Sequence, residues 1–470
     1  MKKKFVKTIS SIQNASYAKP IPYPILLIAI LSLLSGCEKF TQISPPKTQL
    51  DASQVYLNEG TAKAVLSNLY VNAGTLFSGS GTAVNYMGSF LADETQNWST
   101  NLDMQQFAGN QMMATNIFAS AMWQGPYNLI YNCNALLEGI KDNQALTLAT
   151  RNQLQGEALM LRAYAHFYLT SFFGAVPLVI TTDYRINTSL APSSSQAVLQ
   201  SVIADLSQAQ ELLPADYASY GSERIRPNSA APTALLARVY LYAGDYQKSE
   251  AAATQVITNP LYGMGTLNET FLKNSKESIL AYKPIGVFYT GEGGAFILSG
   301  RPTEMSLKPS FVQGFADGDQ RRASWISKIT ATGVDYYFPF KYKLKTATAY
   351  SEYSVLLRLA EQYLIRAEAR ARLNKQDLAL ADLQVIRSRA GLAKPNGNPS
   401  QTEILTMILD ERKFELFTEA AHRWFDLRRF GQIDGVIATA KPGWKAHAAL
   451  LPIPSAELNL NHQLVQNPGY

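Results

Sequence analysis

Two stretches of equal length, "ALLARVYLYAGDYQKSEAAATQVI" (residues 234–257) and "YLIRAEARARLNKQDLALADLQVI" (residues 363–386), decide the fold of this 470-residue chain. In each stretch apolar residues recur at helical spacing on both sides of a short break. The breaks fall at Gly244 and Asn374, residue types that end helices and form tight turns. Each stretch is therefore predicted to form two antiparallel helices.

Small residues recur at matching places in the two stretches. The interval from Ala237 to Ser249 equals the interval from Ala367 to Ala379. Small side chains at these places let two antiparallel helices touch, and the pattern resembles tetratricopeptide (TPR) hairpins. We expect a mainly α fold in which TPR-like hairpins form a right-handed superhelical scaffold.

Two regions depart from the helical pattern. A Gly/Ser/Asn/Thr-rich stretch, residues 74–116, follows a helix that is predicted to stop at Gly74. Residues 258–350 are rich in Gly, aromatic residues and turns, and we interpret them as a loop-rich insertion carrying a few short strands. Loops on a rigid scaffold are where binding usually resides.

The N-terminus is typical of an exported bacterial lipoprotein. A short apolar core, Ile25 to Leu34, follows a basic leader and is too short to span a bilayer, which takes about 20 residues. Leu34-Ser35-Gly36-Cys37 resembles a lipobox, whose thiol receives lipid before cleavage. With only two cysteines, neither a disulfide framework nor a zinc cluster is available. Cys133, on an apolar helical pattern, is interpreted as a small buried hydrophobe.

These features predict three parts of the chain. Residues 1–36 would be the signal peptide, residues 37–50 the lipidated Cys37 with a flexible tether, and residues 51–470 a single helical domain. The formal charge of +6 comes largely from the leader, because residues 37–470 contain 37 basic and 36 acidic residues. This near neutrality gives no electrostatic case for nucleic-acid binding.

The search for catalytic chemistry finds no nucleotide-phosphate loop and no zinc-protease helix. The most suggestive cluster is "ERKFELFTEAAHRWFDLRRFG" (residues 411–431), in which acidic residues and His422 recur on roughly one helical face. A metal site could be imagined there, but interleaved arginines favour ion pairs. We therefore predict no catalytic residue, no metal ligand and no cofactor.

Trp98 is the more interesting residue, since it lies among Asn97, Asn101 and hydroxyl side chains in the first irregular stretch. An exposed indole could stack on a sugar ring, and amides could bond its hydroxyls; alternatively, Trp98 anchors the loop. We expect Trp98→Ala to weaken ligand binding with little change in thermal midpoint. Tyr289 and Arg301 belong to a similar aromatic-plus-polar group in the insertion, together with Phe288 and Phe296.

Several motifs in order resemble the SusD/RagB family of outer-membrane nutrient-binding lipoproteins. They are "VYLNEGTAKAVLSNLY", "GEALMLRAYAHFYLTSFFGAVPLV", "RPNSAAPTALLARVYLYAGDYQKS", "LLRLAEQYLIRAEARARL", "VIRSRAGL", "ERKFELFTEAAHRWFDLRRFG" and the closing "LPIP…QNPGY". The resemblance covers nearly the whole chain after the lipobox. It implies four TPR-like hairpins supporting a loop-rich binding face and a non-catalytic role.

The resemblance also implies a place and a partner. The protein would be lipid-anchored in the outer membrane, facing the cell exterior, and would act as the lid of a SusC-like TonB-dependent barrel transporter. Family ligands are mostly oligosaccharides and in some members peptides. By region, the resemblance points to Asn97, Trp98, Asn101, Tyr289 and Arg301 as ligand contacts. The alternatives are a glycan- or peptide-degrading enzyme and a TPR-type scaffold without a small ligand.

Overall fold

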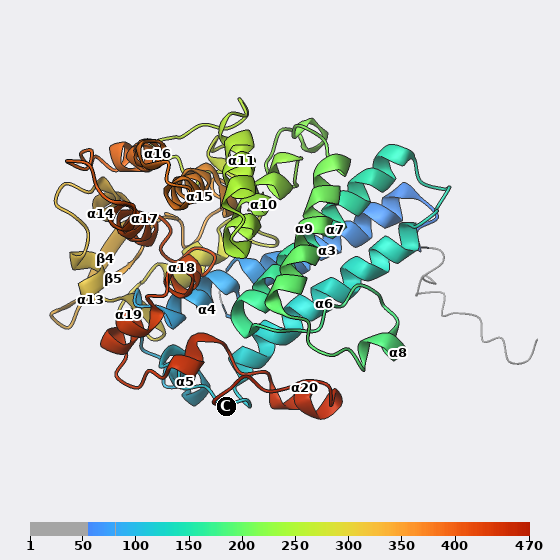
Figure 1. The fold of residues 1–470 in the computed structure, drawn as a ribbon, viewed down its shortest axis with the longest axis horizontal. Helices are drawn as coiled ribbons and strands as arrows, with labels where there is room; N and C mark the ends of the chain where they lie inside the picture. The colour runs from blue at the N-terminus through green and yellow to red at the C-terminus, as the bar shows by residue number, and fades with distance from the viewer. Residues whose placement is uncertain (1–54, 80) are drawn as a thin grey trace, which may run out of the picture. The chain divides into compact units, whose positions relative to one another are not determined.

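The computed structural model describes residues 55–79 and 81–470, and in this part of the chain helices carry the fold (Figure 1). The long helices are α3 (Glu59–Phe77), α6 (Ile117–Ile140), α7 (Leu148–Phe173), α9 (Ser195–Leu212), α10 (Ala230–Ala243), α11 (Tyr246–Ile257), α15 (Leu359–Arg372), α16 (Gln376–Arg389) and α17 (Gln401–Glu415). Neighbours in this series pack side by side, with α7 between α6 and α9, and α15 between α11 and α16. The predictions on residues 1–50, Cys37 included, lie outside the described residues.

The two hairpins that decide the fold form as predicted. Ser249 Oγ donates a hydrogen bond to the Ala237 carbonyl at 2.8 Å, and both residues are fully buried where α10 meets α11. Ala367 and Ala379 lie together in one buried apolar cluster between α15 and α16. The intervening turn at Asn374 has φ 59°, a left-handed conformation that asparagine tolerates well. The mainly α, TPR-like fold is confirmed.

The stretch predicted to be irregular, residues 74–116, is more ordered than expected. It contains α4 (Val84–Leu91), strand β1 (Thr95–Asn97) and α5 (Leu102–Ala108). The first helix also continues past Gly74 to Phe77, against the prediction. A glycine inside a helix costs roughly 1 kcal/mol, but continuing the helix buries the Phe77 ring against Tyr164, with ring centroids 4.6 Å apart.

The loop-rich insertion between α11 and α15 is confirmed, with its few short strands and three short helices. Its elements are β2 (Ser278–Tyr282), α12 (Gly291–Phe296), β3 (Met305–Leu307), α13 (Pro309–Gln313), α14 (Gln320–Trp325), β4 (Ile326–Ala331) and β5 (Val334–Pro339). β2 pairs with β6 (Ser354–Arg358), and the other strands form an antiparallel sheet in the order β1-β3-β5-β4. Strand β1 lies in the first irregular stretch, residues 74–116, whereas β3, β4 and β5 lie in the insertion. This sheet therefore joins the two regions that depart from the helical pattern of the sequence.

The periodicity of the charged motif at residues 411–431 predicts one continuous helix, but the structure shows two. α17 ends at Glu415 and α18 (His422–Arg429) begins after a turn in which Thr418, Ala420 and Ala421 have positive φ. The turn packs on α4, where the Ala420 amide donates to Asn85 Oδ1 at 2.7 Å. This contact joins the turn to a helix far away in the sequence, which periodicity could not reveal.

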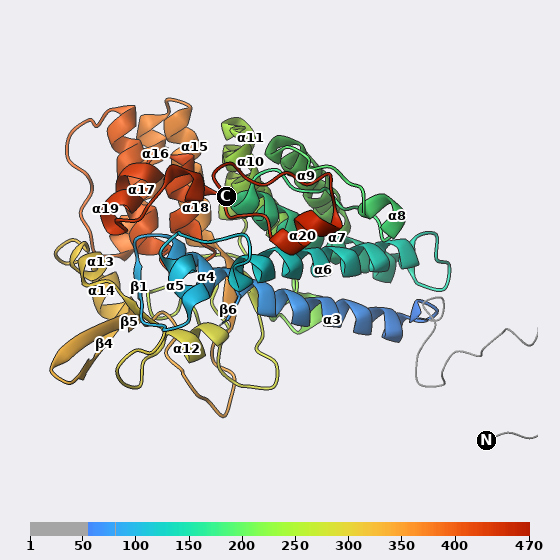
Figure 2. The ribbon, with the colours of Figure 1, turned by 90° about the horizontal axis from the view of Figure 1, so that it is seen from below.

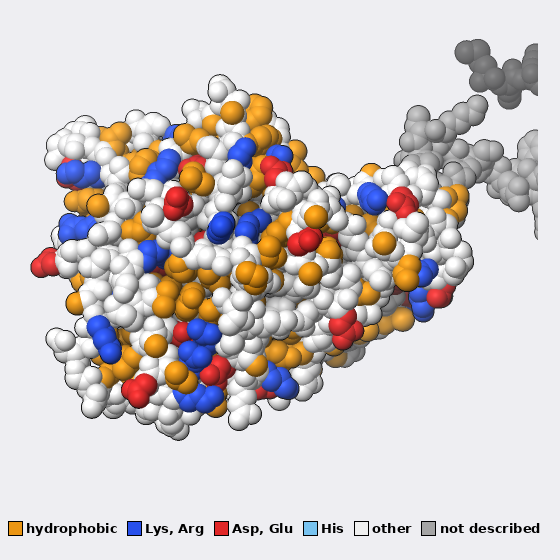
Figure 3. Space-filling model, turned by 90° about the horizontal axis from the view of Figure 1, so that it is seen from above, with side chains coloured by type: hydrophobic (Ala, Val, Ile, Leu, Met, Phe, Trp, Pro, Cys, Tyr) orange, Lys and Arg blue, Asp and Glu red, His pale blue; other side chains and the backbone are white. Residues whose placement is uncertain are grey.

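Three short helices complete the described chain, namely α8 (Tyr184–Asn187), α19 (Ile433–Ala440) and α20 (Ser455–Leu460), with 3₁₀ turns at Ala218–Tyr220 and Ala446–Ala449. α20 and α8 lie near α6 in both ribbon views (Figure 2). Cys133 is fully buried, as predicted, and burial raises the pKa of its thiol. Figure 3 shows basic and acidic side chains interspersed on one face. Across residues 55–79 and 81–470, no helix combines the length and hydropathy needed to cross a membrane.

Candidate functional site

Two of the predicted ligand contacts, Tyr289 and Arg301, line one open pocket of about 570 Å³. The pocket wall is formed by α12 and by the segment that leads from it to β3. Glu304 and Lys345 also line this pocket. We refer to it as the loop pocket. The insertion therefore brings together side chains that are 12 residues apart and a lysine from a separate loop.

Glycines in "TGEGGAF" (residues 290–296) let α12 lie close to two other loops. A Cβ on Gly291 would approach the Gly79 Cα to 2.2 Å, and one on Gly293 would approach the Leu344 carbonyl oxygen to 2.2 Å. Thr290 caps the helix, because its Oγ1 accepts the Gly293 amide at 3.0 Å. The backbone beneath the pocket is thus fixed by close packing.

A buried carboxylate ties α12 to the scaffold. Glu292 accepts hydrogen bonds from Asn85 Nδ2 on α4 at 2.8 Å and from Ser354 Oγ on β6 at 2.7 Å. Burial raises the pKa of Glu292, and these hydrogen bonds partly oppose that rise. The pocket wall is therefore held from below by two elements that belong to different parts of the chain.

The charged side chains of the loop pocket differ in how far they are engaged. Lys345 Nζ donates to the Ile297 carbonyl at 2.7 Å, and Glu304 accepts the Tyr86 hydroxyl at 2.6 Å. The Arg301 side chain is exposed and makes no hydrogen bond or ion pair within the described part of the chain. Within the same pocket lining, the guanidinium of Arg301 can offer hydrogen bonds to a ligand and the Tyr289 ring can offer a stacking surface.

Trp98 adjoins this region without lining the loop pocket. Its amide donates to the Glu304 carbonyl at 2.7 Å, its indole Nε1 donates to Ser306 Oγ at 2.8 Å, and its ring meets Tyr336 edge-on at 5.4 Å. The side chain is half-buried. These contacts give Trp98 the anchoring role that was one of the two interpretations of the sequence. A ligand contact by its remaining exposed surface stays a prediction.

The two predicted asparagines are engaged in local backbone structure. Asn97 Oδ1 accepts the Ser99 amide at 3.1 Å, and Asn101 Oδ1 caps α5 by accepting the Met104 amide at 3.0 Å. Neither residue lines the loop pocket. Their proposed ligand contacts remain predictions, and the structure adds a local reason for both residues to be asparagine.

Neither Glu304 nor Lys345 was predicted from the sequence. Phe288 and Phe296 were grouped together in the prediction, but their surroundings in the structure differ. Phe296 is buried and stacks on Tyr86, so it belongs to the core. Phe288 is 42% exposed and meets the Tyr350 ring at 4.8 Å. The signal for Glu304 and Lys345 was weak, because a lone charge in a turn-rich stretch is ordinary surface.

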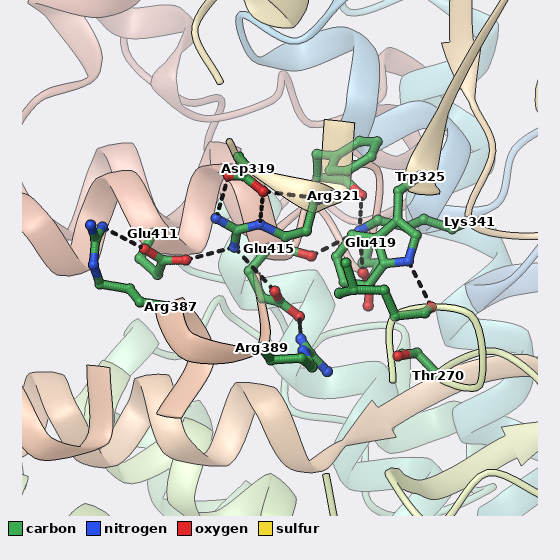
Figure 4. Close-up of polar contacts among 12 residues, drawn as sticks. Thr270, Asp319, Arg321, Trp325, Lys341, Arg387, Arg389, Glu411, Glu415 and Glu419 are labelled. Carbon is green, nitrogen blue, oxygen red and sulfur yellow. Dashed lines mark hydrogen bonds and ion pairs between the residues drawn. The ribbon is translucent and has the colours of Figure 1, made fainter. Parts of the chain in front are cut away.

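The acidic residues of the charged motif are occupied by ion pairs (Figure 4). Glu415 is paired with Arg321, Arg358 and Arg389. Burial alone would raise the pKa of Glu415, but the three arginines lower it well below its usual range. In the described residues no group of three His, Cys, Asp or Glu side chains is arranged to hold a metal ion. The ion-pair interpretation of this motif is the one the structure supports.

Comparison with known proteins gives matches along most of the chain. Residues 42–241 match a family model described as "Starch-binding associating with outer membrane", and residues 305–448 match the model of the SusD family. Two SusD-like proteins of Formosa agariphila are 24% and 23% identical, and the alignments cover 95% and 96% of this chain and 99% of each relative.

Solved structures give the same result. A laminarin-binding SusD-like protein is 25% identical with a TM-score of 0.72, over 88% of this chain and 100% of that one. A SusD superfamily protein of Bacteroides vulgatus is 21% identical with a TM-score of 0.75, over 88% and 99%. The fold is that of a helical-repeat protein, and two SusD-type family models match successive parts of the chain. The chain belongs to the SusD/RagB family.

Proposed function

We propose that this protein is a surface lipoprotein that captures a nutrient oligomer, most simply an oligosaccharide, at its loop pocket. The observation that carries the proposal is that one pocket is lined both by Tyr289 and by Arg301, whose side chain is exposed and has no partner among the described residues. A planar ring gives a sugar a stacking face, and a guanidinium supplies directed hydrogen bonds to its hydroxyl groups. A related solved protein that binds laminarin supports a glucan as the first ligand to test.

Binding without bond breaking is the form of the proposal that the pocket favours. Hydrolysis of a glycosidic bond ordinarily uses two carboxyl groups on either side of that bond. Glu304 is the one carboxylate in the described lining of the loop pocket, and it already accepts a hydrogen bond from Tyr86. A peptide ligand remains the alternative within the same family, because Arg301 could equally bind a peptide carboxylate or carbonyl.

The wider role follows from family membership and the N-terminal sequence. Residues 1–36 would direct export, lipidated Cys37 would anchor the mature chain in the outer membrane, and residues 37–50 would act as a tether for the binding domain. The domain, residues 51–470, would face the exterior and close as a lid over a SusC-like TonB-dependent transporter, to which it delivers its ligand.

The binding proposal is tested by titration calorimetry of the purified protein with laminarin and starch oligosaccharides. Arg301→Ala and Tyr289→Ala should each weaken binding by about tenfold or more, since each removes about 1.4 kcal/mol or more of interaction. Arg322→Ala, which removes an exposed arginine on α14 outside the pocket, is the matched control. Affinities that stay at the wild-type value in both pocket variants would refute the assignment.

The anchor and the partner are tested in cells. Labelling with an alkyne fatty acid should mark the wild-type protein and leave Cys37→Ser unmarked. Pull-down from detergent-solubilised outer membrane should recover a barrel transporter. A set of periplasmic proteins without a barrel would favour the scaffold alternative, and release of new reducing ends from the oligosaccharides would favour an enzyme.

A further inference from the structure

A second open pocket, of about 660 Å³, lies between α6, α8 and α20. It shares no lining residue with the loop pocket. Helix α6 forms its floor, and the segments around α8 and α20 form its walls; Figures 1 and 2 both show these two short helices beside α6. We refer to it as the α6 groove.

The floor of the α6 groove is a row of aromatic rings. Trp123, Tyr127 and Tyr131 recur every four residues, which places them on one face of α6 with a rise of about 6 Å per step. Their exposure increases along the row, from Trp123 at 3% to Tyr131 at 52%. Phe173 fixes the inner end, where its ring meets Trp123 edge-on at 5.0 Å. The row therefore runs from a buried ring at Trp123 to an exposed ring at Tyr131.

Hydrogen bonds hold the walls in place around this floor. Gln124 Nε2 on α6 donates to Glu457 Oε1 on α20 at 3.1 Å. Asn461 Nδ2, at the end of α20, donates to the Leu190 carbonyl beyond α8 at 2.9 Å. The groove is therefore formed in advance, so a ligand would lose little free energy to ordering the protein.

One residue that lines the α6 groove, Asn187, has an acceptor without a partner in the described part of the chain. Asn187 donates through Nδ2 to the Thr181 carbonyl at 2.8 Å, which fixes the orientation of its amide. Its Oδ1 is buried, and it accepts no hydrogen bond from the described residues. Because buried acceptors are almost always paired, this oxygen points to a hydroxyl or a water that completes it.

The character of the remaining lining narrows the class of ligand. Glu457 is the one charged side chain among the described residues that line the α6 groove, and the other polar members are amides and hydroxyls. This described lining offers no cation to an anionic ligand. Tyr184, which is 73% exposed, adds a further ring on the α8 side. Flat apolar faces with neutral hydrogen-bonding groups match a sugar, whose ring faces are apolar and whose edges carry hydroxyls.

We propose that the α6 groove is a second oligosaccharide-binding site, for a neutral glycan, formed by the aromatic row of α6 and by the walls at α8 and α20. Because Trp123 is buried, the rings that a sugar could stack on are Tyr127, Tyr131 and Tyr184. Two sites on one tethered protein would hold a long glycan at two points, which raises its effective local concentration at each of them. The proposal does not require the loop pocket to bind the same glycan.

Hydrogen–deuterium exchange of the purified full chain reads the two pockets separately in one sample. With laminarin hexasaccharide or maltohexaose as probe, we expect slower exchange in peptides covering residues 120–131 and 182–190. Slower exchange confined to residues 289–304 would overturn the groove while supporting the loop pocket. Slower exchange confined to the groove peptides would support the groove and contradict the loop pocket. Exchange unchanged by either probe in the groove peptides would also overturn it.

Variants of the two exposed tyrosines, Tyr131 and Tyr184, supply a second test of the groove. The double change Tyr131→Ala with Tyr184→Ala should abolish the protection of residues 182–190 and should weaken retention on a laminarin or starch gel by about tenfold. Both side chains are exposed, so the thermal midpoint should stay unchanged. Tyr131→Phe with Tyr184→Phe keeps the rings and should bind as the wild type does. Undiminished retention of the alanine variant would overturn the proposal, as would a protein partner on this surface whose binding the glycan does not displace.

Discussion

Two arginines, Arg301 in the loop pocket and Arg358 at the end of β6, differ in burial and in the number of their partners. Arg358 is 2% exposed and donates to Glu277, Glu415 and Glu419 at 2.5–2.9 Å. Arg301 is exposed and makes no such contact within the described residues. Charge alone therefore does not mark the proposed binding site. Arg301 belongs to the proposal because its side chain has no partner among the described residues and lines a pocket whose wall is closely packed.

The buried ion-pair cluster around Arg358 gives a reason for the insertion to be held rigidly on the helical scaffold. The ion-pair cluster of Figure 4 collects side chains from well-separated segments: Arg321 on α14, Lys341 after β5, Arg389 on α16 and Glu415 at the end of α17. It therefore joins the insertion to the helical scaffold. Buried ion pairs give little net stability over apolar packing, but removing one partner is costly. The cluster acts mainly to position the insertion.

The largest expected effect is that of removing Arg358. Arg358→Ala leaves Glu277, Glu415 and Glu419 without their shared partner in a buried site, and it should lower the free energy of unfolding by about 3–5 kcal/mol. Arg301→Ala is the matched control, because an exposed side chain without contacts should change it by less than about 0.5 kcal/mol. Urea denaturation of the two variants measures both values. Equal stabilities would break the comparison.

Acid should act on the same buried region. Burial tends to raise the pKa of Glu415 and Glu419, but Arg358 and the neighbouring cations lower both pKa values below 4.5. Carboxyl groups whose folded-state pKa is lowered stabilise the protein above their unfolded pKa, and this stabilisation is lost as pH falls through the folded-state value. We expect the thermal midpoint to decrease when the pH is lowered below about 4.5. In a folded Glu415→Gln variant that fall should be shallower, and an unchanged slope would contradict the assignment.

The scaffold was predictable from the sequence because it is local. Ala237, Ser249, Ala367 and Ala379 recur at equal intervals, and close helix packing needs small residues at such intervals. The break between α17 and α18 was not predicted, and the turn there is held by a hydrogen bond between Ala420 and Asn85, which are 335 residues apart. Long-range contacts of this kind leave no local pattern.

The loop pocket was predictable only in part, for the same reason. Tyr289 and Arg301 could be chosen from composition, since both stand in an aromatic, turn-rich stretch. Glu304 lies three residues after Arg301 in the same pocket wall but was not predicted, whereas Lys345 comes to the pocket from a separate loop. The sheet that pairs β1 with β3 brings Trp98 beside Glu304, and no spacing in the sequence predicted that pairing. The α6 groove depends on α20, a short helix that was not predicted from the sequence.

A smaller effect is expected at Glu94, a buried carboxyl that lies outside the ion-pair cluster. Burial, with a further contribution from Asp93, raises the pKa of Glu94 to about 8. A carboxyl that stays protonated in the folded state and ionises near 4.5 when unfolded makes the protein less stable as pH rises between these values. Glu94→Gln mimics the protonated form and should add roughly 1–2 kcal/mol of stability at pH 8. The gain should vanish near pH 4.5, and a gain independent of pH would count against this assignment.

The smallest effect is expected at Trp98, which adjoins the loop pocket through its hydrogen bond to Glu304. Trp98→Phe keeps a ring beside Tyr336 and loses the donation to Ser306, so it should cost about 0.5–1.5 kcal/mol of stability. Trp98→Ala loses both contacts and should cost more, so the thermal midpoint is expected to fall where the sequence alone predicted little change. Ligand affinity then separates the two roles of the residue. If the indole also stacks on the ligand, Trp98→Ala should weaken binding while Trp98→Phe retains most of it. If Trp98 only anchors the loop, both folded variants should bind like the wild type, and ligand recognition would rest on side chains such as Arg301.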